Sequence, residues 1–145
     1  MFSGVSEADP LTVWAALENG EKAIVIDCRT RAEWTFVGLP QLPSGAPGMA
    51  LIEWQSYPAM AVEPNFAREA MSAIDEAGAD TAFFLCRSGV RSLHAAVAVS
   101  AAAEAAGRDV TCVNVTGGFE GDPNPQGRRG VLNGWKAQGL PWRQS

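Results

Sequence analysis

Hydrophobic and polar residues follow one another in a pattern that predicts strands separated by helices. The runs 23–26 and 81–85 are short, continuous and apolar, as is typical of strands buried on both faces of a parallel sheet. Runs at 49–52 and 110–115 predict two further strands. Apolar residues at helical spacing, together with capping and stop residues, predict helices over 10–18, 31–36, 66–77, about 92–107 and 131–138.

Strands that alternate with helices in this way predict the α/β class. Crossovers between parallel strands are right-handed, which implies a central, mostly parallel sheet in a three-layer domain with helices on both faces. The chain has 145 residues, near the common size of one domain, so we expect residues 1–145 to form a single domain. Prolines and glycines within 38–48, and prolines at 58 and 64, predict irregular loops over most of 38–64.

Charge and targeting signals narrow the classes of partner. The net charge is -5 and the isoelectric point is near 4.8, which would repel a phosphate backbone, so we expect no nucleic-acid partner. No window has the apolar length of a spanning helix, and Met1–Glu7 lacks the basic start and apolar run of a secretory signal. We therefore expect a cytoplasmic protein with no membrane association.

Three cysteines require separate interpretations. Cys28, Cys86 and Cys112 form an odd set without paired spacing, which argues against a disulfide framework and against a metal site. Cys112 lies within a predicted strand and is expected in the core. Cys28 follows a strand and is expected to be a small buried hydrophobe, although it could resolve an oxidised Cys86 if the two strand ends are adjacent.

Cys86 is the candidate nucleophile because it begins a tight loop between a strand and a helix. Backbone N–H groups of such a loop lack intrahelical partners and can converge on an anion, and the helix dipole adds positive potential there. Donors and cations together favour the thiolate, which is the reactive form of cysteine. The residues expected to form this anion-binding loop are Arg87, Ser88, Gly89, Val90, Arg91 and Ser92.

The same loop could stabilise a persulfide after Cys86 accepts a sulfur atom. Such a reaction proceeds in two half-reactions and requires no metal or organic cofactor. A cysteine phosphatase or an arsenate reductase is the competing hypothesis, but a phosphatase loop places its arginine six positions after the cysteine. In this chain position six is Ser92 and the arginine is Arg91, at position five. The shorter loop favours a single sulfur atom over a tetrahedral phosphate.

Several motifs in order along the chain resemble those of single-domain rhodanese sulfurtransferases. Asp27-Cys28-Arg29 with Glu33-Trp34 is similar to the Asp-x-Arg and Glu-Trp pattern of that family, and the segment 86–92 is similar to its active-site loop. Gly117-Gly118 and the C-terminal segment 134–142 match its later motifs. The resemblance implies a rhodanese-like fold and transfer of sulfur from thiosulfate or a persulfide donor to a thiol or cyanide through a Cys86 persulfide.

Other polar residues near the loop are expected to support it. Asp27, Arg29 and Glu33 follow a buried strand, where charged residues usually tie loops together. Arg91 could touch substrate or pair with a carboxylate, and we favour substrate contact. His94 is expected to be a packing or surface residue.

The segment 38–64 departs from the family pattern, which bears on the choice of partner. The family often has Gly-His-Ile-Pro-Gly-Ala where this chain has Gly38-Leu39-Pro40-Gln41. A small sulfur-donor anion and a thiol acceptor remain the expected partners. A non-catalytic binding module, or a relay that exchanges sulfur with a protein donor or acceptor, is the alternative.

Overall fold

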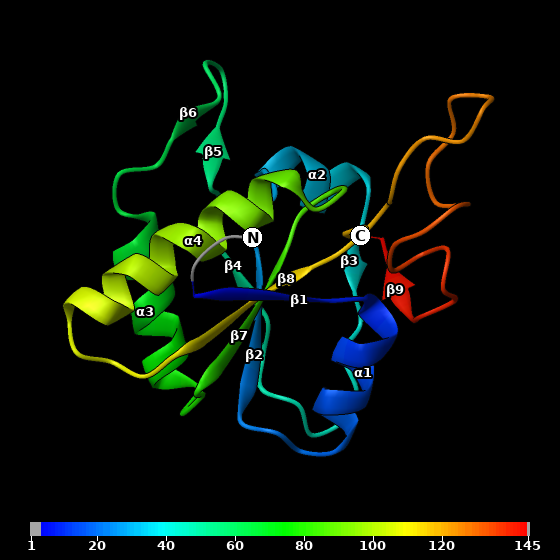
Figure 1. Ribbon diagram of the computed structural model, residues 1–145. Coiled ribbons are helices and arrows are strands. Elements are labelled where there is room, and N and C mark those ends of the chain that lie inside the picture. The colour runs from blue at the N-terminus through cyan, green and yellow to red at the C-terminus, as the bar shows by residue number, and fades with distance from the viewer. Residues whose placement is uncertain (1–3, 145) are drawn as a thin grey trace.

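A computed structural model describes residues 4–144 and contains a five-stranded, fully parallel sheet (Figure 1). The strand order is β1-β8-β7-β2-β4. Two predictions fall partly on Met1–Ser3 and Ser145, which lie outside the described residues. They are the outer bounds of the domain 1–145 and the interpretation that Met1–Glu7 lacks a secretory signal. The strands are β1 (Val5–Ala8), β2 (Ala23–Asp27), β4 (Ala50–Leu51), β7 (Thr81–Leu85) and β8 (Thr111–Val115).

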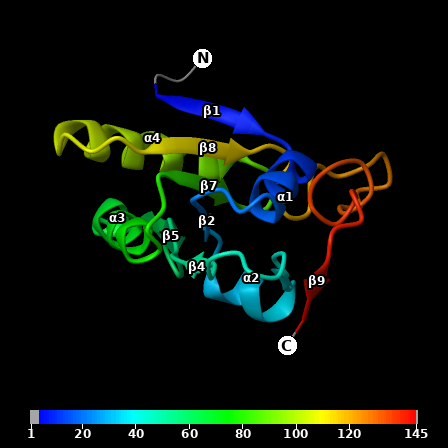
Figure 2. The same ribbon diagram turned by 90° about the horizontal axis from the view of Figure 1, so that it is seen from below.

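Helices cover both faces of this sheet (Figure 2). Helices α3 (Phe66–Glu76) and α4 (Val90–Ala105) pack on one face, and α1 (Pro10–Glu18) packs on the other. Helix α2 (Arg31–Phe36) follows β2 and begins with a capping box between Thr30 and Glu33. The expected α/β domain with a parallel sheet between two layers of helices, the rhodanese-like architecture, is confirmed.

The core is divided by the sheet into two apolar clusters. Side chains of successive strand residues point to opposite faces. Ile24, Ile26 and Phe84 therefore pack toward α3 and α4, whereas Val25 and Leu85 pack toward α1. The continuous apolar runs in the sequence reflect this burial on both faces. Among residues 4–144, no helix has both the length and the apolar character needed to cross a bilayer.

One prediction about local structure was wrong, and one strand was not predicted. Residues 131–138 form turns instead of a helix, because the N–H groups of Trp135 and Lys136 donate to Gly118 O and Phe119 O, at 2.8 and 3.1 Å. Strand β1 was not anticipated, because Val5–Ala8 is short and half polar and is stabilised by its pairing with β8.

The segment predicted as irregular also contains short strands. β5 (Gln55–Ser56) and β6 (Ala61–Val62) form a small hairpin, and β3 (Leu39–Pro40) pairs with β9 (Trp142–Arg143) near the C-terminus. The hairpin projects from the body of the domain, at the top of Figure 1. The segment 38–64 is therefore mostly loop, as expected, but β3 and β4 fix it to β9 and β2, while β5 and β6 pair with each other.

Candidate active site

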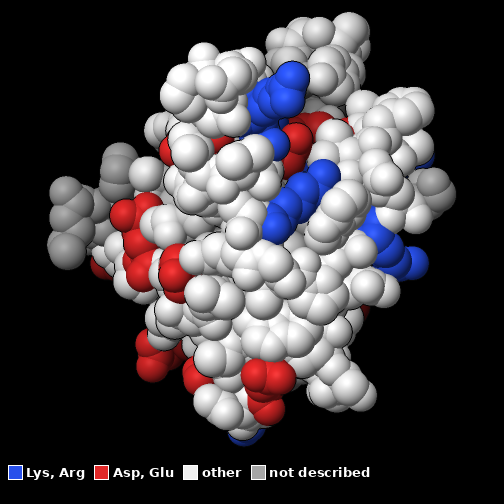
Figure 3. Space-filling view, turned by 90° about the vertical axis from the view of Figure 1, so that its right-hand side faces the viewer, with Lys and Arg blue, Asp and Glu red and all other residues white. Residues whose placement is uncertain are grey.

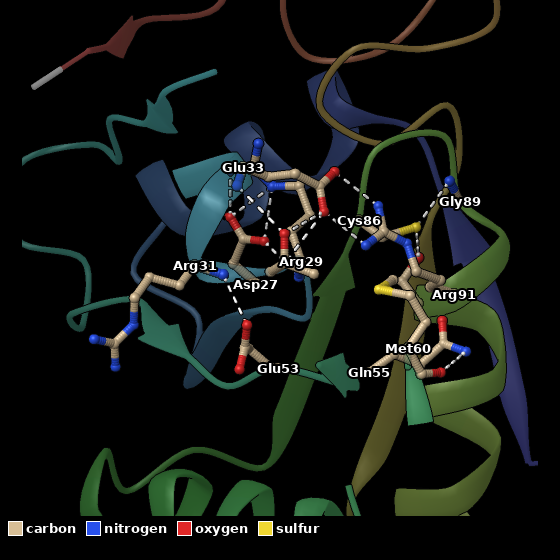
Figure 4. A network of polar contacts seen from close by, with 12 residues as sticks. Asp27, Arg29, Arg31, Glu33, Glu53, Gln55, Met60, Cys86, Gly89 and Arg91 are labelled. Atoms are coloured by element: carbon tan, nitrogen blue, oxygen red, sulfur yellow. Dashed lines mark hydrogen bonds and ion pairs between the residues drawn. The ribbon is translucent and has the colours of Figure 1, made fainter. Parts of the chain in front are cut away.

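Cys86 lies directly after β7, beneath the start of α4. The residue is 1% exposed, and its Sγ accepts a hydrogen bond from the Gly89 N–H at 3.1 Å (Figure 4). The Ser92 Oγ lies 3.2 Å from the same sulfur. The structure thus brings the middle of the predicted loop, at Gly89, and its last residue, Ser92, to the sulfur of the predicted nucleophile.

The conformation of Gly89 allows the loop to be this tight. Gly89 is the N-cap of α4 and has φ of 108°, in the region that favours glycine. Helix α4 then begins at Val90, so the N–H groups of its first turn have no carbonyl partner within the helix. Those dipoles, together with the macrodipole of a 16-residue helix, place positive potential beside the sulfur.

Asn114, a residue that sequence reasoning did not select, holds the loop from the neighbouring strand β8. Its Nδ2 donates to Gly89 O and to Glu7 Oε2, both at 3.1 Å, so its Oδ1 is free to accept from the Ser92 hydroxyl at 2.6 Å. Ser92 has one hydroxyl proton, which can be given either to Asn114 or to the Cys86 sulfur. The sequence signal for this role was an asparagine within the mostly apolar run 110–115, because a buried amide needs hydrogen-bond partners.

The glycine pair after β8 packs against the backbone of the loop. The Phe119 N–H donates to Cys86 O at 2.8 Å, and the Glu120 N–H donates to Arg87 O at 2.9 Å. A Cβ on Gly118 would lie 2.5 Å from Cys86 O, so no side chain fits at this position. The Gly117-Gly118 motif therefore supports the loop through close backbone packing.

Arg91 is paired with Glu33 by two parallel hydrogen bonds. Nη1 and Nη2 donate to the two carboxylate oxygens at 2.7 and 2.8 Å. Burial of the Glu33 carboxyl opposes its ionisation, but hydrogen bonds from Arg91 and Thr30 outweigh that effect and lower its pKa to about 2. The same ion pair raises the pKa of Arg91, against the effect of burial. The guanidinium thus connects α4 to α2, and its direct contact with substrate stays a prediction.

Asp27 and Arg29 form a second ion pair that is completely buried. Arg29 Nη2 lies 2.7 Å from Asp27 Oδ2 and also donates to Gly38 O at 2.8 Å. The guanidinium carbon lies 4.4 Å from the centroid of the Phe119 ring. This arrangement fixes the end of β2 to the loops around it, which is the supporting role expected for both residues.

The remaining predicted residues differ in exposure. Arg87 and Val90 are exposed, Ser88 is half-buried and His94 is exposed on α4. On the face shown in Figure 3, most of the basic side chains lie in the upper half, and most of the acidic ones lie to the left and below. Within the described part of the chain, no group of three or more His, Cys, Asp or Glu residues could hold a metal ion.

Comparisons with known proteins identify close relatives of the whole domain. No family model matches the chain. The chain is 32% identical over 127 residues to the uncharacterized protein RP600 homolog of Rickettsia rickettsii, covering 88% of each chain. It is 32% identical over 121 residues to the uncharacterized protein RP600 of Rickettsia prowazekii, covering 83% of each.

A solved structure is similar over the full length. The crystal structure of Rv0390 from M. tuberculosis has a TM-score of 0.77 and 35% identity, and the match covers 100% of both chains. Identities above 30% over most of the chain indicate common descent, so this chain belongs to one family with the rickettsial RP600 proteins and Rv0390.

Proposed function

We propose that this protein is a rhodanese-type sulfurtransferase in which Cys86 carries the transferred sulfur as a persulfide. The observation that carries the proposal is the position of the Cys86 sulfur at the N-terminal end of α4, 3.1 Å from the Gly89 N–H. Amide dipoles in this arrangement stabilise negative charge on sulfur, both on a thiolate and on the outer atom of a persulfide. The resemblance of its loop and flanking motifs to rhodaneses supports the same reaction.

The reaction consists of two nucleophilic displacements. The Cys86 thiolate attacks the outer sulfur of thiosulfate, a new S–S bond forms, and sulfite leaves with the electron pair of the broken S–S bond. An acceptor thiolate or cyanide then attacks the outer sulfur of the persulfide, and the Cys86 thiolate is the leaving group. The protein supplies the nucleophile and the dipoles, and neither step requires a metal or an organic cofactor.

Three features of the site favour sulfur transfer over phosphate-ester hydrolysis. Position six of the loop is Ser92, which is buried against the Cys86 sulfur and Asn114. The guanidinium of Arg91 is engaged by Glu33. Cys86 is almost completely buried, so a slim sulfur donor reaches its sulfur more readily than a bulky phosphate ester does.

Partners follow from the charges near the site. Arg87 is exposed next to Cys86, and its positive charge would attract a small sulfur-donor anion despite the net negative charge of the chain. The acceptor is a thiol or cyanide. We place the reaction in the cytoplasm, where thiols remain reduced, in keeping with three free cysteines.

Intact mass spectrometry after incubation with thiosulfate tests the proposal. We expect a mass gain of one sulfur atom on the wild type and none on Cys86→Ser. Cys112→Ser is the matched control, because Cys112 is also buried but lies within β8. Cyanide should then release thiocyanate from the loaded wild type. Absence of both sulfur loading and thiocyanate with thiosulfate and with persulfide donors would refute the assignment, and turnover of an aryl phosphate would favour the phosphatase.

One observation supports a protein-partnered relay as the second candidate. The β5–β6 hairpin projects from the domain and exposes 62% of Tyr57 and 49% of Val62, as an interaction surface would. A relay would accept sulfur from a protein persulfide and react poorly with thiosulfate. Capture of a sulfur-donor protein by Cys86→Ser, with loss of capture after Tyr57→Ser, would favour the relay.

A further inference from the structure

Two cysteines lie side by side at the ends of adjacent strands. β2 pairs with β7 in a register that ends at Asp27 and Leu85, and the Cys28 N–H extends this ladder by donating to Leu85 O at 2.8 Å. Cys28 is therefore the neighbour of Cys86 across the sheet. Adjacent strands are about 4.8 Å apart, which lies within the range of Cα separations that a disulfide can bridge, about 4.4–6.8 Å.

Both side chains also point to the same face of the sheet. Cys28 continues the alternation of Ile24 and Ile26, which pack beneath α3 and α4. The Cys86 sulfur faces Gly89 and Ser92 at the start of α4, on that same face. The two thiol groups are thus on one side of the sheet with no strand between them.

Cys112 does not share this position, although it is equally buried. Its partner in the register is Ala82, four residues before Cys86 along β7. At about 3.3 Å per residue this offset is about 13 Å, far beyond the reach of a disulfide. The chain therefore contains one cysteine placed to react with Cys86 and one matched cysteine that is not.

The environment of Cys28 favours the protonated form of its thiol. Burial raises the pKa of Cys28 well above its ordinary value, and the charges of Cys86 and Asp27 raise it further. The Cys28 thiol therefore does not compete with Cys86 for a sulfur donor. It can react only with a sulfur that is held next to it and is electrophilic.

We propose that Cys28 is the resolving thiol of the site and discharges the Cys86 persulfide as hydrogen sulfide, an inference that rests on the proposed function. Cys28 Sγ attacks the inner sulfur of the persulfide, the Cys28–Cys86 disulfide forms, and the S–S bond to the outer sulfur breaks. The outer sulfur leaves as sulfide and takes up the proton of the Cys28 thiol. Both cysteine sulfurs are oxidised and the sulfane sulfur is reduced by two electrons.

A low-molecular-weight or protein dithiol closes the cycle. Its thiolate attacks the Cys28–Cys86 disulfide, and a second exchange returns both cysteines to the thiol form while the dithiol becomes a disulfide. In this way the domain would deliver sulfide at the expense of a dithiol, in addition to passing sulfane sulfur to an external acceptor.

Sulfide release after loading with thiosulfate, in the absence of any added thiol or cyanide, tests this proposal. We expect the wild-type persulfide to be transient: the chain first gains one sulfur atom, then releases one sulfide and ends two hydrogens lighter than the reduced protein. A non-reducing peptide map of the wild type should contain Cys28 linked to Cys86. Cys28→Ser and Cys28→Ala should instead keep a long-lived persulfide and release no sulfide, whereas Cys112→Ser should behave as the wild type.

The possible failures are distinguishable. A wild-type persulfide that survives as long as that of Cys28→Ser, with no linked peptide, would overturn the role of Cys28 and leave sulfur transfer intact. Absence of any persulfide on Cys86 in the Cys28→Ser and Cys28→Ala variants, together with no sulfide release and no linked peptide from the wild type, would overturn both the sulfurtransferase assignment and this step. The wild-type peptide map decides between these results even where a Cys28 variant fails to fold.

Discussion

Replacement of Gly118 by alanine is the sharpest test of how the active-site loop is supported. An added Cβ would lie 2.5 Å from Cys86 O and 2.6 Å from both C and O of Arg87. These are backbone atoms, which cannot rotate aside, so the loop itself must shift. Gly118 also has φ of 61°, which adds backbone strain for any residue with a Cβ.

Gly127 offers a matched control for the strain alone. Its φ is 77°, and nothing lies within 4 Å of an added Cβ. We expect Gly127→Ala to lower the free energy of unfolding by about 1–2 kcal/mol, the cost of the left-handed conformation. Gly118→Ala should lose that amount and about 1–3 kcal/mol more for the overpacked contact.

Urea unfolding and the rate of sulfur loading on Cys86 measure the two effects. With a slope of about 1–3 kcal/mol per molar urea, the extra loss in Gly118→Ala should lower its midpoint by about 1 M relative to Gly127→Ala. Because the displaced loop carries Cys86, the proposed nucleophile, we expect Gly118→Ala to load sulfur at least about tenfold more slowly. Equal midpoints for the two variants, or an unchanged loading rate in Gly118→Ala, would refute this account of the loop.

Further predictions concern the ion pairs and the buried amide of the site. Asp27→Asn leaves the buried Arg29 guanidinium without its counter-charge and should lower the free energy of unfolding by about 3–5 kcal/mol in urea titrations, whereas Asp75→Asn, at an exposed pair, should change it little. The pKa of Glu33 is about 2 in the folded protein, below its ordinary 4.5, so its contribution of about 3 kcal/mol is present above pH 4.5 and is lost as the pH falls toward 2. The stability difference between wild type and Glu33→Gln should therefore vanish over that window, and a difference independent of pH would contradict the ion pair. Asn114→Ala should cost about 1–3 kcal/mol and slow sulfur loading, since it leaves buried groups of the loop unpartnered. A loading rate equal to that of the wild type would show that the loop does not depend on β8.

Local patterns in the sequence were sufficient for the framework of the domain. The apolar runs at β2 and β7 are continuous because both faces of the sheet are covered, and that burial is visible in composition alone. The helices predicted over 10–18 and 31–36 begin at the capping residues Asp9 and Thr30, and because caps act on neighbouring residues both starts were predicted correctly. The strand-loop-helix order around Cys86 is likewise local, so the position of Cys86 and the amides beside it could be predicted without coordinates.

Interactions between distant segments were decided only by the tertiary structure. Arg91 and Glu33 are 58 positions apart in the sequence. Whether Arg91 pairs with a carboxylate therefore depends on where α2 lies beside α4. The failure of the helix at 131–138 has the same origin, because its N–H groups find carbonyls near Gly118 instead of their own turn. Asn114 and Cys28 acquire their positions at the site from strand order and register, which arise when the whole sheet assembles and which no short window of sequence encodes.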